Sequence, residues 1–397
     1  MNPRLDRLQP YPFERLRQLT VGIVPNDALS PIALSVGEPR HATPAFIRDT
    51  LSAHLDGLSR YPATQGGLAL REAQAAWLTT RFGLHDVNPA TQVLPTLGSR
   101  EALFPLTQVL MDPGHADTMA VCPNPFYQIY EGAVLLAGGQ PWFVNADPAR
   151  EFLVDYGSVP DTVWQRTALV FTCSPGNPTG HVMTLNEWQT LFELSDKHGF
   201  TIVSDECYTD IYPDDKNPPL GGLQAAQFLG RHDFPRLVAL FSLSKRSNVP
   251  GMRSAFAAGD ARIIERFLLY RTYHGSAMNP AVQQASAVAW RDEGHVRLNR
   301  QLYQTKMDTF HRMVHPHLPL ERPEAGFYYW ARTPLPDTTF TLGLLSQMNV
   351  SLLPGSLLAR SAHGMNPGEN RVRIALVGSL EETIEAAHRI VTYVNTL

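Results

Sequence analysis

The sequence has few cysteines, no long apolar run and little excess of either charge. Its 397 residues include three cysteines, Cys122, Cys173 and Cys207, which show neither metal-ligand spacing nor a disulfide framework. We therefore expect reduced thiols in a cytoplasmic protein, and no metal site. No window approaches about 18 uninterrupted apolar residues, so we expect no membrane contact. The formal net charge of -4 offers no basic field for nucleic acid.

The length of the chain predicts more than one domain, because single hydrophobic cores stop growing at roughly 250–300 residues. Hydrophobic residues make up 44% of the chain and charged residues 18%, as is usual for a soluble globular protein. We expect a large domain over residues 45–279 and a smaller α+β domain over residues 280–397. The N-terminal segment, residues 1–44, is expected to join the small domain.

The central part of the chain alternates short apolar runs with amphipathic helical patterns. This alternation predicts an α/β fold, a mostly parallel central sheet sandwiched by helices. Ligands bind such sheets at the carboxyl ends of the strands. The expected strands are 93–97, 118–122, 140–144, 168–173, 201–205, 237–241 and 254–258, with helices at 100–111, 129–137 and 186–198. In the last third we expect helical structure over 280–318, strands at 327–331 and 371–377, and a final helix at 380–397.

A lysine follows one of the apolar strands directly. Lys245 ends the run 242–245, in which Ser242 and Ser244 flank a leucine, and Arg253 comes after a Pro-Gly turn. A lysine amine in this setting suits a Schiff base, with the arginine and a serine holding a phosphate. An exposed loop lysine is an equally good interpretation of these residues taken alone.

Two further motifs follow other predicted strands. Asp205 ends the strand 201–205, and a carboxylate at a buried strand end needs a partner such as a pyridinium nitrogen. Tyr208, shortly after it, could donate to a ring oxygen, although a helix-capping carboxylate is a common alternative for Asp205. Asn177 lies in the run 174–180, where two prolines and two glycines fix a tight loop. By composition alone this loop is more simply a turn.

The run 98–100 passes from a strand directly into a helix, and the N–H groups at a helix start can bind an anion. Each of these motifs is modest by itself. In chain order they supply a phosphate site, an aromatic ring at Tyr127, a ring-oxygen partner, a pyridinium partner and an amine. Those are the groups that a bound pyridoxal phosphate requires.

With these motifs in this order, the sequence resembles the class I and II aminotransferases, which are fold type I pyridoxal-phosphate enzymes. The resemblance runs from residue 34 to Arg373 and implies pyridoxal 5'-phosphate as cofactor. It implies Lys245 as the Schiff-base lysine and general base, and Asp205 as the partner of the pyridinium nitrogen. Asn177 and Tyr208 would contact the ring oxygen, and Tyr127 would stack on the ring. The phosphate would be held by Gly98, Ser99, Arg100, Ser242 and Arg253.

The resemblance also implies how substrate and subunits meet. Gly37, Asn177 and Arg373 would receive the α-carboxylate of the amino-acid and 2-oxo-acid substrates. Tyr61 would reach the phosphate of a partner subunit, which implies a homodimer. Ala255 and Ala375 depart from the glycine and serine that many members have there. The substrate's distal groups need partners too, and Arg15, Arg40 and residues 276–279 are candidates by position only.

A nearer likeness is to the bacterial succinyldiaminopimelate aminotransferases of lysine biosynthesis, in the stretches 2–16, 98–104 and 242–248. It implies ping-pong exchange between glutamate and N-succinyl-2-amino-6-oxopimelate. Three alternatives stay open on the same fold: an aspartate, aromatic or acetylornithine aminotransferase, a carbon–sulfur β-lyase, and a pyridoxal-phosphate-sensing transcription regulator. The last is disfavoured, since the chain is mildly acidic and has no room for a DNA-binding domain before Leu34.

Overall fold

The computed structural model describes residues 1–115 and 117–397 of the chain. Its larger part is built on an eight-stranded sheet of order β2-β9-β8-β7-β6-β3-β4-β5. The strands from β4 through β3, β6 and β7 to β8 pair in parallel, and β9 lies antiparallel between β8 and β2. The strands are β2 (Val93–Thr96), β3 (Met119–Asn124), β4 (Gln140–Asp147), β5 (Leu153–Val154), β6 (Thr167–Cys173), β7 (Thr201–Asp205), β8 (Leu237–Ser242) and β9 (Ala255–Gly259). The seven strands expected in this region are confirmed.

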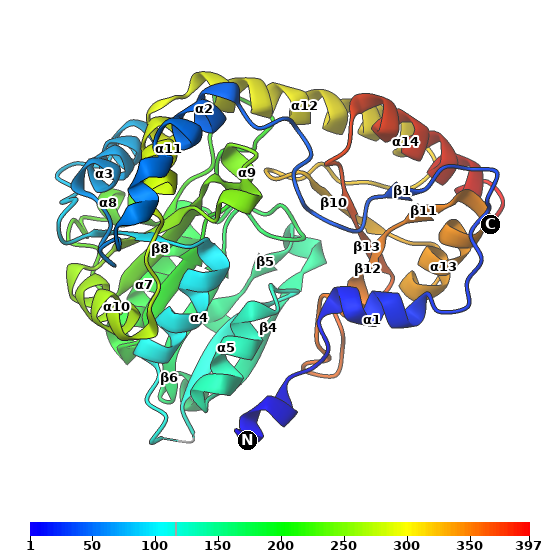
Figure 1. Cartoon of the computed structure of the whole chain (residues 1–397). Coiled ribbons are helices and arrows are strands. Elements are labelled where there is room, and N and C mark those ends of the chain that lie inside the picture. The colour runs from blue at the N-terminus through cyan, green and yellow to red at the C-terminus, as the bar shows by residue number, and fades with distance from the viewer. Residues whose placement is uncertain (116) are drawn as a thin grey trace.

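Helices cover both faces of the sheet (Figure 1). Strand β8 shows why, because Ala239 and Phe241 join one hydrophobic cluster while Val238 and Leu240 join the other. Successive side chains of a strand point to opposite faces, so a strand buried on both sides is apolar throughout. One face carries α4 (Ser99–Leu110), α5 (Ile129–Ala137) and α10 (Ala261–His274). The other carries α3 (Leu68–Phe82), α7 (Leu185–His198), α8 (Gly222–Phe228) and α11 (Pro280–Arg291).

The smaller part has two small sheets and its own apolar core. One sheet has the order β10-β13-β12 and is antiparallel, and β1 pairs in parallel with β11. That second pairing fixes the N-terminal segment to the C-terminal third of the chain. The elements are β1 (Ile32–Ala33), β10 (Tyr328–Arg332), β11 (Val350–Ser351), β12 (Leu353–Pro354), β13 (Arg371–Ala375), α13 (Asp337–Met348) and α14 (Leu380–Val394). The two strands and the final helix expected here are confirmed.

The long helix α12 (Gly294–Val314) joins the two parts, and it crosses the top of Figure 1 between α11 and α14. Trp290 of α11 belongs to a core cluster of the large sheet, whereas Phe310 of α12 belongs to the small core. We therefore propose that the division between the domains falls within α12 and not at residue 280. The remaining α-helices among the described residues are α1 (Pro12–Leu19), α2 (Ala45–Ala53), α6 (Asp161–Trp164) and α9 (Leu243–Arg246). Within the described ranges, none of the helices has the length and apolar character that crossing a membrane requires.

Candidate active site

A cavity of about 550 Å³ lies where the carboxyl ends of β6, β7 and β8 face strand β13 of the small part. This volume is in the range of small-molecule sites, roughly 300–1,000 Å³. Strands that run parallel place their carboxyl ends at one edge of the sheet, which explains why residues distant in sequence meet there. Most of the predicted site residues line it: Gly37, Ser99, Arg100, Tyr127, Asn177, Asp205, Tyr208, Ser242, Lys245, Arg253 and Arg373.

Lys245 projects into the cavity from the short helix α9, directly after β8. Its Nζ donates a hydrogen bond to the carbonyl oxygen of Gly37 at 2.6 Å. Burial lowers the pKa of Lys245 to about 8, so an appreciable share of the amine is neutral and nucleophilic near neutral pH. A side chain at position 37 would collide with the Tyr328 hydroxyl, so only glycine lets the main chain at this position lie so close to Tyr328.

Asp205 ends β7 and is 6% exposed. Its Oδ2 accepts a hydrogen bond from the Tyr130 hydroxyl at 3.1 Å, and its Oδ1 accepts one from the Cys207 N–H at 3.4 Å. Burial raises the pKa of Asp205 despite these donors, because the charged form is poorly solvated there. A protonated pyridine nitrogen beside the carboxylate would stabilise that charged form, so Asp205 fits the cofactor ring.

The phosphate end of the expected cofactor corresponds to the start of α4. Gly98 precedes this helix with φ 93, and a side chain there would meet the Arg253 guanidinium. The Ser242 and Ser244 hydroxyls lie 3.0 Å apart and line the same cavity. Free N–H groups at a helix start, an arginine and two hydroxyls together suit a phosphate dianion. These residues therefore fit pyridoxal phosphate.

The side chain of Arg100 is engaged elsewhere. Its Nε donates to the Tyr127 hydroxyl at 2.6 Å and its Nη2 to the Tyr11 hydroxyl at 3.4 Å. The guanidinium thus lies against the N-terminal segment, while Arg253 occupies the position beside Gly98. A phosphate contact of Arg100 stays a prediction, and it concerns the main-chain N–H at the start of α4.

Arg373 on β13 is 5% exposed and lies across the cavity. Its Nη1 donates to Asn177 Oδ1 at 3.1 Å and its Nη2 to the Ser35 carbonyl at 2.8 Å. Its guanidinium also covers the Tyr328 ring at 4.5 Å. The buried Nε has no hydrogen-bond partner among the described residues. A buried charged donor without a partner is costly, and a substrate carboxylate would satisfy it.

Tyr61 does not join this cavity. Its side chain is fully exposed, and it is absent from the described residues that line the site. Of the distal-group candidates, Arg40 pairs instead with Glu382 at 2.7 Å. Neither Arg40 nor Arg15 lines the cavity in the part of the chain that the structure describes.

Sequence reasoning missed residues that shape the site. Tyr328 donates to or accepts from Tyr208 at 2.9 Å between the two hydroxyls, yet its run of aromatic residues indicated only a strand. Tyr130 holds Asp205, yet its sequence position indicated only a helix. Tyr11 was part of a distinctive N-terminal motif, and nothing in that motif pointed to Arg100. No local signal identifies such partners, since each contact forms only when distant segments meet.

Comparison with known proteins agrees with this geometry. The model of the family "Aminotransferase class I and II" matches residues 30–390. An LL-diaminopimelate aminotransferase of Moorella thermoacetica is 32% identical over 397 residues, 98% of this chain and 96% of that protein. The crystal structure of an aminotransferase from Neisseria meningitidis superposes with a TM-score of 0.96 at 48% identity and covers 99% of each chain. A probable N-succinyldiaminopimelate aminotransferase from Thermus thermophilus superposes at 0.84 with 26% identity, covering 96% of this chain and 98% of that one.

The match extends over nearly the whole chain and includes the cavity, which confirms the expected fold type and cofactor. Members of this family hold pyridoxal phosphate and exchange an amino group between an amino acid and a 2-oxo acid. The chain therefore belongs to the class I and II aminotransferase family and is a pyridoxal-phosphate-dependent transaminase.

Proposed function

We propose that this transaminase works in the diaminopimelate branch of lysine biosynthesis, with N-succinyl-LL-2,6-diaminopimelate and 2-oxoglutarate as one substrate pair. The names of its relatives support the branch: the Moorella protein acts on LL-diaminopimelate and the Thermus protein is a probable N-succinyldiaminopimelate enzyme. Those names differ in whether the distal amine is succinylated. The choice between them depends on the distal end of the cavity.

The observation that supports the succinylated choice is a positive charge on the cavity wall, the Arg100 guanidinium, and we place the distal end of the substrate beside it. Free diaminopimelate has both an ammonium and a carboxylate at its distal carbon, whereas succinylation removes the ammonium and adds a second carboxylate. Arg100 lies on the wall of the cavity and is held by the hydroxyls of Tyr127 and Tyr11. A fixed guanidinium attracts carboxylates and repels an ammonium, so it favours the succinylated substrate.

The roles of the site residues follow from their positions and are part of the proposal. Pyridoxal phosphate, when bound, supplies the carbonyl carbon that takes the amino group and a ring that withdraws electrons. Lys245 carries the cofactor and then moves a proton at the substrate α-carbon with its Nζ. Asp205 keeps the ring nitrogen protonated, and Tyr208 with Asn177 holds the ring oxygen. Arg373 and Gly37 orient the α-carboxylate.

We further propose a homodimer in which Tyr61 serves the partner's phosphate site. Tyr61 is fully exposed in this chain, and Leu55, Leu58 and Leu68, which are close to it in sequence, are also exposed. Clustered exposed apolar side chains are typical of an interaction surface. The three free cysteines agree with a reducing compartment, and we propose the cytoplasm.

The deciding experiment runs the reaction in reverse with purified enzyme and 2-oxoglutarate as acceptor. We expect glutamate to form from N-succinyl-LL-diaminopimelate at least about tenfold faster, in kcat/KM, than from free LL-diaminopimelate, with parallel double-reciprocal lines for ping-pong kinetics. A preference for the free compound would overturn the succinylated choice while retaining the branch. Pyruvate and ammonia formed from a thioether amino acid without any acceptor would indicate a β-lyase instead.

A further inference from the structure

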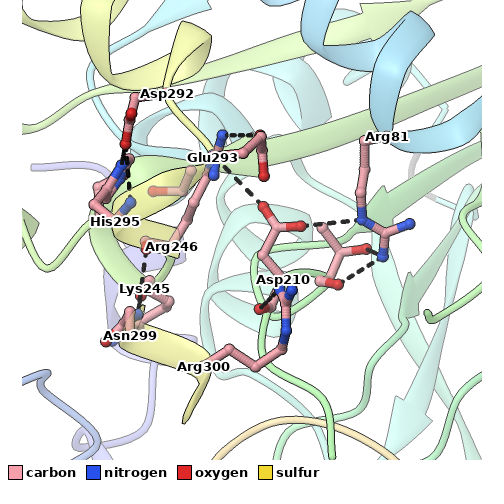
Figure 2. A network of polar contacts seen from close by, with 12 residues as sticks. Arg81, Asp210, Lys245, Arg246, Asp292, Glu293, His295, Asn299 and Arg300 are labelled. Carbon is pink, nitrogen blue, oxygen red and sulfur yellow. Dashed lines mark hydrogen bonds and ion pairs between the residues drawn. The ribbon is translucent and has the colours of Figure 1, made fainter. Parts of the chain in front are cut away.

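One side chain of α12, Asn299, contacts the main chain of the turn that carries Lys245. Helix α9 has only four residues, too few to pair its last carbonyl groups internally. Asn299 of α12 supplies the missing donors, because its Nδ2 donates to the Lys245 carbonyl at 3.1 Å and to the Arg246 carbonyl at 3.2 Å. Figure 2 shows Asn299 directly beside this turn. The catalytic lysine is thus fixed to α12 through its main chain.

The oxygen atom of the Asn299 amide also has two hydrogen-bond partners. Its Oδ1 accepts a hydrogen bond from Asn248 Nδ2 at 2.9 Å and lies 2.7 Å from His41 Nδ1. Because Nδ2 must donate to two carbonyl groups, Oδ1 can only accept, and His41 therefore carries its proton on Nδ1. His41 Nε2 is then an acceptor, and Lys306 Nζ donates a hydrogen bond to it at 2.8 Å. Every hydrogen-bonding position of the amide has a partner.

The groups beyond His41 agree with this assignment. Lys306 is buried, and its Nζ also donates to the Gly378 carbonyl at 2.9 Å. Burial lowers the pKa of His41, and the charge of Lys306 lowers it further. Burial likewise lowers the pKa of Lys306 to about 7, with Glu382 and Arg40 as the charged groups near it. A neutral imidazole that donates through Nδ1 is what these surroundings favour.

His41 belongs to a segment that also touches the lysine amine. Residues 36–43, here called the strap, run without regular structure between β1 and α2. The strap offers the Gly37 carbonyl to Lys245 Nζ at 2.6 Å, and Thr43 donates to the Asn248 carbonyl at 3.0 Å. The strap therefore meets Lys245 at its amine directly and at its main chain through His41 and Asn299.

We propose that Asn299 is a positioning residue for Lys245, which fixes the lysine main chain on α12 and, through His41, sets the strap against the lysine amine. The proposal rests on the proposed role of Lys245 as the Schiff-base lysine. Without the Asn299 amide the carbonyl groups of Lys245 and Arg246 lose this donor and the turn can shift. A displacement of about 1 Å at a reacting group costs on the order of 100-fold in rate.

The test compares Asn299→Leu with a matched control, Asn145→Leu, in the holoenzyme. Asn145 also donates to a main-chain carbonyl, that of Ala362 at 3.0 Å, and accepts from another asparagine, Asn124, at 2.7 Å, but it does not line the cavity among the described residues. For Asn299→Leu we expect kcat to fall about 10- to 100-fold, KM for glutamate to stay within about twofold because Arg373 is intact, and the pH midpoint of the visible absorbance to move. Asn145→Leu should lower the thermal midpoint of unfolding. It should leave kcat, the KM for glutamate and the pH midpoint of the visible absorbance unchanged.

A second pair of variants keeps the proposal testable if Asn299→Leu does not fold. His41→Asn places an N–H where Nδ1 stands, whereas His41→Leu removes it. We expect His41→Asn to retain at least about tenfold more kcat than His41→Leu, and its absorbance midpoint to stay nearer to that of the parent enzyme. The proposal is overturned if Asn299→Leu behaves as Asn145→Leu does, or if the two His41 variants are alike in both readouts.

Failure of this proposal is distinguishable from failure of the proposed function. The absorbance midpoint is measured without substrate, so it does not depend on which amino acid the enzyme prefers. A wrong substrate assignment appears in the parent enzyme as absent turnover of diaminopimelate compounds. A wrong lysine assignment appears as a visible Schiff-base band that persists in Lys245→Ala.

Discussion

Replacement of Arg373 by lysine tests how the substrate carboxylate is held, and the structure gives its expected size. Arg373 divides its donors among three directions: Nη1 to Asn177, Nη2 to Ser35, and a buried Nε without a partner among the described residues. A lysine keeps the charge but has one nitrogen, which cannot reach three acceptors that surround a planar guanidinium. Arg373→Lys must therefore lose at least one charge-assisted hydrogen bond.

A hydrogen bond to a charged group contributes about 1.5–3 kcal/mol, and each 1.4 kcal/mol corresponds to about tenfold in affinity. We expect kcat/KM to fall about 10- to 150-fold for the amino donor. For the acceptor, kcat/KM should fall by the same factor to within about threefold, since both substrates carry the α-carboxylate that Arg373 binds. Stopped-flow measurement of the two half-reactions, each at low substrate concentration, gives the two values separately.

Arg371→Lys is the matched control for this substitution. Arg371 lies on the same strand, donates to the Trp330 carbonyl at 3.3 Å and covers the Phe152 ring at 4.8 Å, and it does not line the cavity among the described residues. We expect both half-reactions of this variant to stay within about twofold of the parent. A loss in Arg373→Lys confined to one half-reaction would refute the reasoning and assign Arg373 to the distal group of that substrate.

Three further predictions follow from other contacts. Asp205→Asn should lower kcat about 100- to 1,000-fold, by analogy with the loss of a preorganised polar partner, while the visible absorbance still forms; near-normal turnover would exclude the pyridinium role. Burial opposes the charge of His181, but its two glutamate partners raise its pKa to about 9. The charged His181 therefore stabilises the folded protein fully below its ordinary pKa of about 6.5, and this stabilisation is lost as pH rises through 9. The thermal midpoints of the parent and His181→Gln should accordingly differ most near pH 6 and converge above pH 9, and a constant difference would contradict this. Inactive Lys245→Ala and Tyr61→Ala chains, mixed under subunit exchange, should regain activity toward half per hybrid dimer, whereas a mixture that stays inactive would show that Tyr61 acts within its own chain.

The elements that the sequence predicted well are those whose pattern is local and long enough to read. Strand β8 is apolar on both faces, and α7 is bounded by a capping box at Thr184 and by Gly199 with φ 82. Strands β1, β11 and β12 have only two residues each, which is too short for any periodicity to show.

The candidate site divides in the same way. Asp205 ends a strand and Lys245 and Asn177 come within a few residues of one, so their convergence was predictable from the rule that parallel strands end at one edge. Tyr130 and Tyr328 were not predictable, because the contacts that give them meaning involve Asp205 and Tyr208, which lie far from them in the chain. A helix or strand pattern indicates which residues are buried, but not which hydroxyl will meet which carboxylate.

The charged residues behind Lys245 show why the turn needs support beyond packing. Arg246 is 2% exposed and pairs with Glu293 at 2.5 Å and with Asp210 at 3.5 Å, while Arg81 holds the other oxygen of Asp210 at 3.0 Å (Figure 2). Turning Arg246 outward would take one of two ion-pair partners from Asp210, and breaking a buried ion pair costs up to about 3–5 kcal/mol. The network therefore favours the arrangement that places Arg246 inward. Lys245 and Arg246 belong to the same four-residue helix, so a fixed Arg246 also limits how far the Lys245 main chain can move, and the Asn299 amide fixes the carbonyl groups of both residues.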